Sequence, residues 1–205
     1  MKIYLASGNL HKTREFQELA GGLPKVEVIS AAAIGGMPPV VEDTGTFEGN
    51  ACKKARALWE RLPAGAWALS DDSGLCVDAL GGSPGVESAY YAGMQATGAQ
   101  NLDKLVAVLR DVPPDRRAAH YACVLVLIGP DRIEHRFEGR CDGRLLNEPT
   151  GTGGFGYDPV FVPEGQVRTF AELDAAVKNE LSHRGRAWAK LAAWLRWNDS
   201  ESNGS

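Results

Sequence analysis

Five short polar segments, each with a glycine, carry most of the residues that could do chemistry in this chain. They are SGNLHKTRE at 7–15, EDTGTF at 42–47, SDDSGLCVD at 70–78, GTGGFGYDP at 151–159 and KNELSHRGRA at 178–187. Loops rich in carboxylates, cations and backbone amides are where binding and catalysis usually take place. Together the segments suit a metal-assisted reaction on a small molecule that carries both phosphates and a base.

The first segment has the features of a phosphate-binding loop. An apolar run at 2–6 leads into the loop 7–9 and then into a helical pattern that includes Phe16 and Leu19. Such a strand–loop–helix unit directs backbone N–H groups at an anion, and Lys12 adds a positive charge. The segment lacks the second glycine and the spacing of G-x-x-x-x-G-K-[ST], so a Walker-type triphosphatase is not predicted. The alternative is an ordinary helix start with a solvated lysine.

Two adjacent acids in the third segment, Asp71 and Asp72, need a positive charge nearby. Successive strand residues point to opposite faces, so the two acids are expected to have different roles. Asp72 with Glu42 would form a hard oxygen site for Mg²⁺, which binds through one or two carboxylates plus substrate phosphates. The alternatives are an Asx-turn with two solvated acids and, for Glu42, a simple charge at the start of the next helix.

The fourth and fifth segments could hold a base. GTGGFG at 151–156 matches the letters of the dinucleotide fingerprint, but β-prone residues at 160–162 follow it where that fingerprint requires a helix. A loop that offers the face of Phe155 for stacking is favoured, with a flexible turn as the alternative. In the fifth segment, Lys178 precedes cations at a helix start, where cations are disfavoured unless a polar ligand faces them. This pattern indicates a reader of a base edge, and the alternative is a helix cap with polar residues in its first turn.

Hydrophobic periodicity predicts the elements that position these segments. Strands are expected at 2–6, 26–30, 66–69 and 75–77, helices at 47–62 and 102–109, a hairpin from 121–128 and 133–141, and a last helix from about Ser182. The result is an α/β chain with some antiparallel pairing.

Composition narrows the class of protein. With 205 residues and 44% hydrophobic content, one domain over 1–197 is expected, followed by a polar, disordered tail at 198–205. The net charge of -4 argues against nucleic-acid binding. The four cysteines are scattered, which predicts neither zinc nor disulfides and fits a reducing cytoplasm. No run approaches the roughly 20 apolar residues of a membrane span, so a soluble, cytoplasmic protein is expected.

The five segments, in this order, resemble those of the inosine triphosphatase (Ham1/RdgB-like) family over about residues 3–196. The resemblance implies an α/β fold with an elongated mixed sheet flanked by helices, in two lobes around a central cleft, and a homodimer. It also implies Mg²⁺-dependent hydrolysis of nonstandard purine nucleotides, namely ITP, dITP and XTP, to the monophosphate and pyrophosphate.

Carried over by motif, the resemblance makes Asp72 the proton acceptor and assigns Glu42 and Asp72 to the metal, with Glu15 a weaker catalytic candidate. It implies substrate contacts for fourteen residues, which are Ser7, Gly8, Asn9, Leu10, His11, Lys12, Ser73, Phe155, Gly156, Tyr157, Asp158, Lys178, His183 and Arg184. The first six would bind the triphosphate, and those from Phe155 onward would surround the base.

Two departures from the family pattern are visible. Gly49 stands where the family has a glutamate, and Tyr90 stands where it has an arginine. Neither departure changes the implied reaction class. Two rival functions remain: a nucleotide sensor that binds without cleaving, and a nicotinamide oxidoreductase built on GTGGFG.

Overall fold

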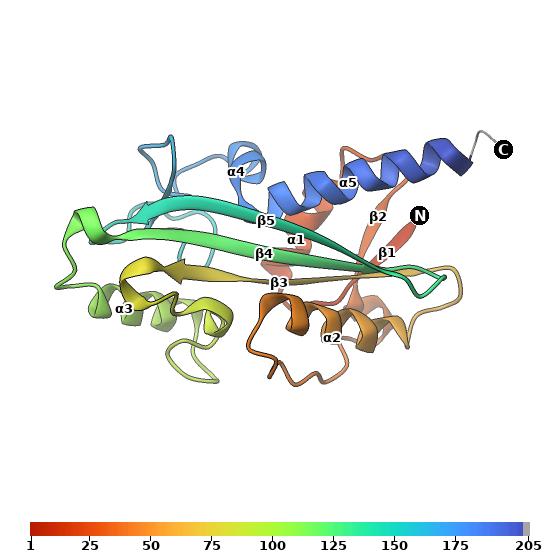
Figure 1. Ribbon diagram of the computed structural model, residues 1–205, viewed down its shortest axis with the longest axis horizontal. Helices are drawn as coiled ribbons and strands as arrows, with labels where there is room; N and C mark the ends of the chain where they lie inside the picture. The colour runs from red at the N-terminus through yellow and green to blue at the C-terminus, as the bar shows by residue number, and fades with distance from the viewer. Residues whose placement is uncertain (203–205) are drawn as a thin grey trace. The chain divides into compact units, whose positions relative to one another are not determined.

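Six strands form one mixed sheet in the order β2-β1-β3-β4-β5-β6 in the computed structural model, which describes residues 1–202. The strands are β1 (Lys2–Leu5), β2 (Glu27–Ser30), β3 (Trp67–Val77), β4 (Ala118–Ile128), β5 (Glu134–Leu145) and β6 (Phe161–Pro163). The α-helices are α1 (Leu10–Ala20), α2 (Phe47–Trp59), α3 (Gly98–Val108), α4 (Ala175–Leu181) and α5 (His183–Ser202). Strand β1 pairs in parallel with β2 and β3 (Figure 1), whereas β6 pairs antiparallel with β5. The predicted mixed α/β sheet with flanking helices is confirmed.

Contacts within the chain divide it into two compact units. The first consists of Met1–Asp72, Cys123–Gly139 and the chain from Arg184 onward, and the second of Ser73–Ala122 and Arg140–His183. Strands β3, β4 and β5 each have residues in both units.

In the first unit, helices cover both faces of the sheet. Phe16 of α1 and Leu191 of α5 share one buried cluster with Leu125 of β4. Ala51 and Ala55 of α2 share another with Val124, the neighbour of Leu125. Because adjacent strand residues point to opposite faces, α1 and α5 lie on one side of the sheet and α2 on the other. The apolar positions of α2 recur at three- and four-residue steps, as a helix with one buried face requires.

The second unit has its own aromatic core. Leu105 of α3 is fully buried in a cluster with Tyr121, Phe161 and Phe170. The Tyr121 and Phe161 rings meet edge to face at a centroid distance of 4.8 Å. Aromatic pairs prefer this arrangement, and here it joins Tyr121 of β4 to Phe161 of β6, the strand after the loop that follows β5.

Three elements differ from the sequence-based prediction. Residues 70–74, expected as a turn between two strand pieces, continue as strand within β3. Helix α4 was not predicted, because its seven residues are too few to show a helical period. Helix α5 begins at His183 as expected but continues to Ser202, and the remainder of the predicted tail lies outside the described residues. The predicted hairpin is confirmed, since β4 and β5 are neighbours in the sheet joined by a short loop (Figure 1).

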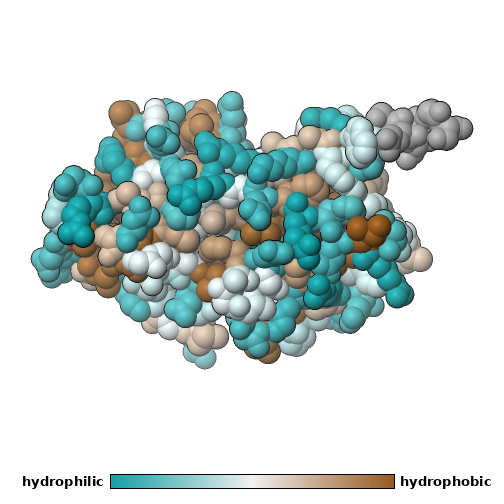
Figure 2. Space-filling view, viewed as in Figure 1, coloured by the Kyte–Doolittle hydropathy of each residue, from teal (hydrophilic) through white to brown (hydrophobic). Residues whose placement is uncertain are grey.

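Figure 2 shows hydrophilic side chains interspersed with more hydrophobic ones over one face. Over residues 1–202, no helix is both long and apolar enough to cross a membrane.

Candidate active site

The acidic pair lies inside β3, and its two carboxylates have different partners. Strand β3 lies between β1 and β4, so both neighbours support an extended backbone through SDDSG. Asp71 contacts Lys12 of α1 and Arg184 of α5, whereas Asp72 contacts Lys54 of α2. These helices lie on opposite faces of the sheet, so the two carboxylates point to opposite faces, as strand geometry predicts. The predicted turn is wrong because cations on both faces compensate the buried charges.

Asp71 is fully paired. Its Oδ2 lies 2.9 Å from Lys12 Nζ and 3.2 Å from Arg184 Nη2, and its Oδ1 accepts from the Cys123 thiol at 3.3 Å. Burial alone would raise the pKa of Asp71, but the charges of Lys12 and Arg184 outweigh it and hold that pKa well below its usual range. Asp71 therefore stays ionised and is suited to orienting its neighbours.

Arg184 links this acid to Glu15. Its Nη1 donates to Glu15 Oε2 at 2.5 Å, and its side chain is 4% exposed. Burial opposes the charged form, yet Asp71 and Glu15 raise the pKa of Arg184 above its usual range. The guanidinium thus joins α1, β3 and α5 through two carboxylates.

Asp72 forms a second cluster with Glu42 and Lys54. Lys54 Nζ lies 2.5 Å from Asp72 Oδ1 and 3.0 Å from Glu42 Oε2. Burial raises the pKa of Asp72 from 3.8 to about 6, against the opposing effect of the Lys54 charge. A carboxyl with such a pKa is well matched to accept a proton near neutral pH.

The donor set of this second cluster fits a divalent cation. Asp72 Oδ2 is buried and has no hydrogen-bond partner among the described residues. The Glu42 side chain is 40% exposed, so an ion can reach the pair from solvent. Among the side chains that the structure describes, no group of three or more His, Cys, Asp or Glu residues is placed for a metal. Two carboxylates completed by water or phosphate oxygens are the pattern by which proteins bind Mg²⁺.

The predicted phosphate loop precedes α1, and Asn9 caps the helix. Its Oδ1 accepts from the backbone N–H groups of His11 at 2.9 Å and Lys12 at 3.3 Å, and its own N–H donates to Ser7 Oγ. An anion bound here would compete with Asn9 for the backbone N–H groups of His11 and Lys12. Gly8 and Leu10 are exposed, and a side chain at Gly8 would meet nothing within 4 Å. The loop therefore has room for a ligand.

Gly49 has a packing reason in this chain. Thr46 caps α2 by accepting from the Gly49 N–H at 3.1 Å, and Thr44 Oγ1 donates to Asn50 Oδ1 at 2.8 Å. A Cβ at residue 49 would overlap the Thr44 side chain. Glycine at residue 49 therefore leaves room for Thr44, which packs on the first turn of α2. The structure gives no reason for the second departure, at Tyr90.

In the second unit, Asp158 organises the predicted base-binding loop. Its Oδ2 accepts from the Phe155 N–H and from Lys178 Nζ, both at 2.8 Å. Gly154 has a φ of +68°, and a Cβ there would collide with the same carboxylate. Lys178 Nζ lies 5.1 Å from the centre of the Phe155 ring. An aromatic face and an ammonium group are therefore held together, and no helix begins in this loop, which removes the structural basis of the oxidoreductase alternative.

The remaining predicted residues have structural partners in the second unit. Tyr157 is buried and donates to the Ser88 carbonyl at 2.8 Å. The His183 ring stacks on Tyr121 at 4.6 Å with an interplanar angle of 8°. Ser73 lies in β3 and is half-buried, and Gly156 follows Phe155 with a φ of +62°.

Lys54 is the residue that the sequence-based prediction missed. It is buried and follows Asn50 by four residues, next to the buried alanines of α2. Two polar residues, one turn apart beside the apolar positions of a predicted helix, were the available signal. Its neighbour Lys53 is half-buried and binds the exposed Asp43.

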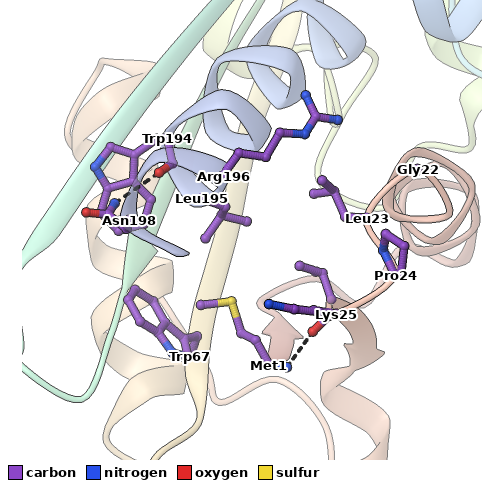
Figure 3. A pocket seen from close by; sticks show the side chains of 11 residues that line it. Met1, Gly22, Leu23, Pro24, Lys25, Trp67, Trp194, Leu195, Arg196 and Asn198 are labelled. Carbon is purple, nitrogen blue, oxygen red and sulfur yellow. Dashed lines mark hydrogen bonds between the residues drawn. The ribbon is translucent and has the colours of Figure 1, made fainter. Parts of the chain in front are cut away.

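A cavity of about 440 Å³ in the first unit is separate from these clusters. It is largely apolar, with walls from Leu23, Trp67, Trp194 and Leu195, and the side chains of Met1 and Lys25 border it (Figure 3). The described residues that line it include none of those predicted for the site.

Two solved structures of Ham1 proteins share this architecture. A HAM1 protein from Coxiella burnetii matches with a TM-score of 0.83 and 37% identity, covering 96% of this chain and 98% of that one. The Ham1 protein of Staphylococcus aureus matches with a TM-score of 0.83 and 34% identity, covering 97% and 100%.

Sequence comparison agrees with the structural match. The Ham1 family model matches residues 3–194, and this chain belongs to that family. A protein of Opitutus terrae named dITP/XTP pyrophosphatase is 61% identical over 201 residues, covering 96% of this chain and 99% of that protein.

Proposed function

We propose that this chain hydrolyses the nonstandard purine nucleotides ITP, dITP and XTP to the nucleoside monophosphate and pyrophosphate, with Mg²⁺ as the metal. The observation that carries the proposal is the Glu42–Asp72 pair, in which a buried Asp72 oxygen has no partner among the described residues. Family membership and the name of the Opitutus terrae relative support the substrate class. A homodimer, which the resemblance implies, and a cytoplasmic location, which the scattered cysteines favour, complete the proposal.

The reaction needs charge neutralisation at the phosphates and a base for water. Glu42 and Asp72 would hold Mg²⁺, which supplies electrostatic stabilisation of the phosphate oxygens when bound. Asp72, with its raised pKa, would accept a proton from the attacking water. Lys12 and the amides of the loop 7–10 would take the remaining phosphate charge. Glu15 would act on Lys12 and Asp71 through Arg184, as a positioning residue.

Selection of the base would depend on the second unit. Phe155 offers a stacking face, and Lys178 can donate to the 6-carbonyl that hypoxanthine and xanthine carry in place of the amino group of adenine. Asp158 fixes the Lys178 ammonium, so the donor is held in place before substrate arrives. Ser73, Gly156, Tyr157 and His183 would line the nucleotide. The Arg184 guanidinium binds Asp71 and Glu15, so we assign it to positioning those acids and leave the base contact to Lys178.

A panel of nucleoside triphosphates tests this proposal, with pyrophosphate and phosphate measured separately. We expect pyrophosphate from ITP, dITP and XTP, and little product from ATP. The Asp72→Asn variant should lose at least ~10²-fold in kcat, as expected when a general base is removed. Nucleotide binding without pyrophosphate release would favour the sensor alternative, and release of phosphate alone would contradict the proposed bond cleavage.

A further inference from the structure

Lys54 occupies the position between the two proposed metal ligands. Its Nζ lies 3.0 Å from Glu42 Oε2 and 2.5 Å from Asp72 Oδ1. One carboxylate comes from the loop before α2 and the other from the middle of β3, so the ammonium joins two separate segments. The Lys54 side chain is 11% exposed, and its buried stem on α2 limits where the ammonium can reach. We propose that Lys54 is a placeholder for the divalent cation, which holds Glu42 and Asp72 in position and is displaced when the metal enters.

Electrostatics explains why a placeholder is needed. Two carboxylates that converge on one point repel each other, and Asp72 is too deeply buried for water to screen that repulsion fully. The Lys54 ammonium is a compact charge with three donors, so it can bind an oxygen of each carboxylate at once. It thereby keeps the ligands together in the absence of metal.

The same geometry makes Lys54 a competitor of the metal. A metal held by Glu42 and Asp72 would need carboxylate oxygens of the same two residues that Lys54 now contacts. An ammonium group beside a divalent cation is strongly repelled. The Lys54 ammonium and the metal therefore cannot bind Glu42 and Asp72 at the same time. By thermodynamic linkage, each weakens the binding of the other to these carboxylates. The Glu42 carboxylate, whose side chain is 40% exposed, would give an incoming ion its first contact. The buried Asp72 Oδ2, which has no hydrogen-bond partner among the described residues, would then be available to the ion.

Lys53 provides a matched control on the same helix. It pairs with the exposed Asp43, and its side chain is 38% exposed. Lys53 also donates to the Val41 carbonyl at 2.9 Å, so it holds the two neighbours of Glu42 but contacts neither Glu42 nor Asp72. Replacing Lys53 therefore changes the net charge of the protein by the same amount as replacing Lys54, without removing a contact to the proposed metal ligands.

The test is a titration of the full chain with Mn²⁺ in the absence of nucleotide. Electron paramagnetic resonance measures the concentration of free Mn²⁺ at each step. We expect Lys54→Met to bind Mn²⁺ roughly tenfold more tightly than wild type, which is within the range of measured site–site couplings. Lys54→Arg should bind no more tightly than wild type, because the guanidinium can hold both carboxylates. Lys53→Met should match wild type. In thermal unfolding, Lys54→Met should be less stable than wild type in EDTA, and Mg²⁺ should restore more stability to it than to wild type.

Equal or weaker Mn²⁺ affinity in Lys54→Met would overturn the placeholder, as would an equal gain in Lys53→Met. If Lys54→Met does not fold, Lys54→Gln is measured against the same expectations, since it also removes the charge. The double variant Lys54→Met with Glu42→Gln should lose the tight binding, and tight binding that persists there would place the ion elsewhere. The inference rests on Glu42 and Asp72 as the proposed metal ligands but not on catalysis. If the protein did not release pyrophosphate, the Mn²⁺ affinities would still test the role of Lys54.

Discussion

Asp71 and Asp72 are adjacent in the sequence, yet their pKa values shift in opposite directions. Lys12 and Arg184 surround Asp71 and lower its pKa, whereas burial with one lysine nearby raises the pKa of Asp72. The cause is strand geometry, which directs the two side chains to helices on opposite faces. The ionised acid is suited to orient cations, and the acid with the raised pKa is suited to exchange a proton.

The raised pKa of Asp72 predicts a specific pH dependence of stability in the absence of metal. Its folded-state pKa of about 6 exceeds the unfolded value of 3.8, so the folded chain binds this proton more tightly. The stabilisation is complete below about pH 4 and is lost as the pH rises through 6. Between pH 5 and 7.5, wild type should lose about 1 kcal/mol relative to Asp72→Asn. Urea unfolding of both proteins in EDTA measures this difference.

Asp71 should contribute nothing to that change. Its folded-state pKa is lowered, so its stabilisation is present at any pH above its unfolded value and is lost only at lower pH. A wild-type minus Asp72→Asn difference that is the same at pH 5 and pH 7.5 would contradict the raised pKa of Asp72.

At the scale of elements, sequence patterns predicted those that show a clear period. The strand 121–128, the hairpin after it and helix α2 have such periods and are present. The strand through SDDSG could not be predicted, because its support comes from β1, β4 and cations far away in the sequence. Lys54 was missed for the same reason: its role depends on Asp72, which is eighteen residues away on another element. Residue types at loop ends indicated the remaining candidates, but their pairing required the fold.

The loop after β5 allows a prediction about stacking. Phe155 is half-buried above Lys178 and is held through its N–H by Asp158. Phe155→Ala should weaken binding of every purine triphosphate by roughly 1–3 kcal/mol with little change in selectivity, because stacking tolerates any base. Steady-state kinetics with ITP and ATP measure this. An unchanged KM for ITP in Phe155→Ala would show that the loop has only a structural role.

Lys178→Met should instead lower kcat/KM for ITP far more than for ATP.

At the scale of the whole molecule, the question is whether the two units unfold together. The sequence predicts one domain over 1–197, and three strands have residues in both units. All five tryptophans belong to the first unit, so their fluorescence follows that unit alone. Leu105, fully buried in the core of the second unit, is far from them in sequence and offers a way to destabilise the second unit selectively.

Leu105→Ala should lower the midpoint of the tryptophan-detected thermal transition, although it removes no atom from the unit that holds the tryptophans. Loss of a buried leucine costs about 2–5 kcal/mol, which for a chain of this size corresponds to roughly 5–15 °C. Because β3, β4 and β5 continue from one unit into the other, melting the second unit would fray the strands on which the first is built. The transition seen by far-ultraviolet circular dichroism should therefore coincide with the tryptophan transition in both wild type and variant. Leu125→Ala, in the core of the first unit, serves as the matched control and should shift both signals equally. If Leu105→Ala splits the two signals and leaves the tryptophan midpoint where it was, the units are separate domains, and the single-domain prediction fails.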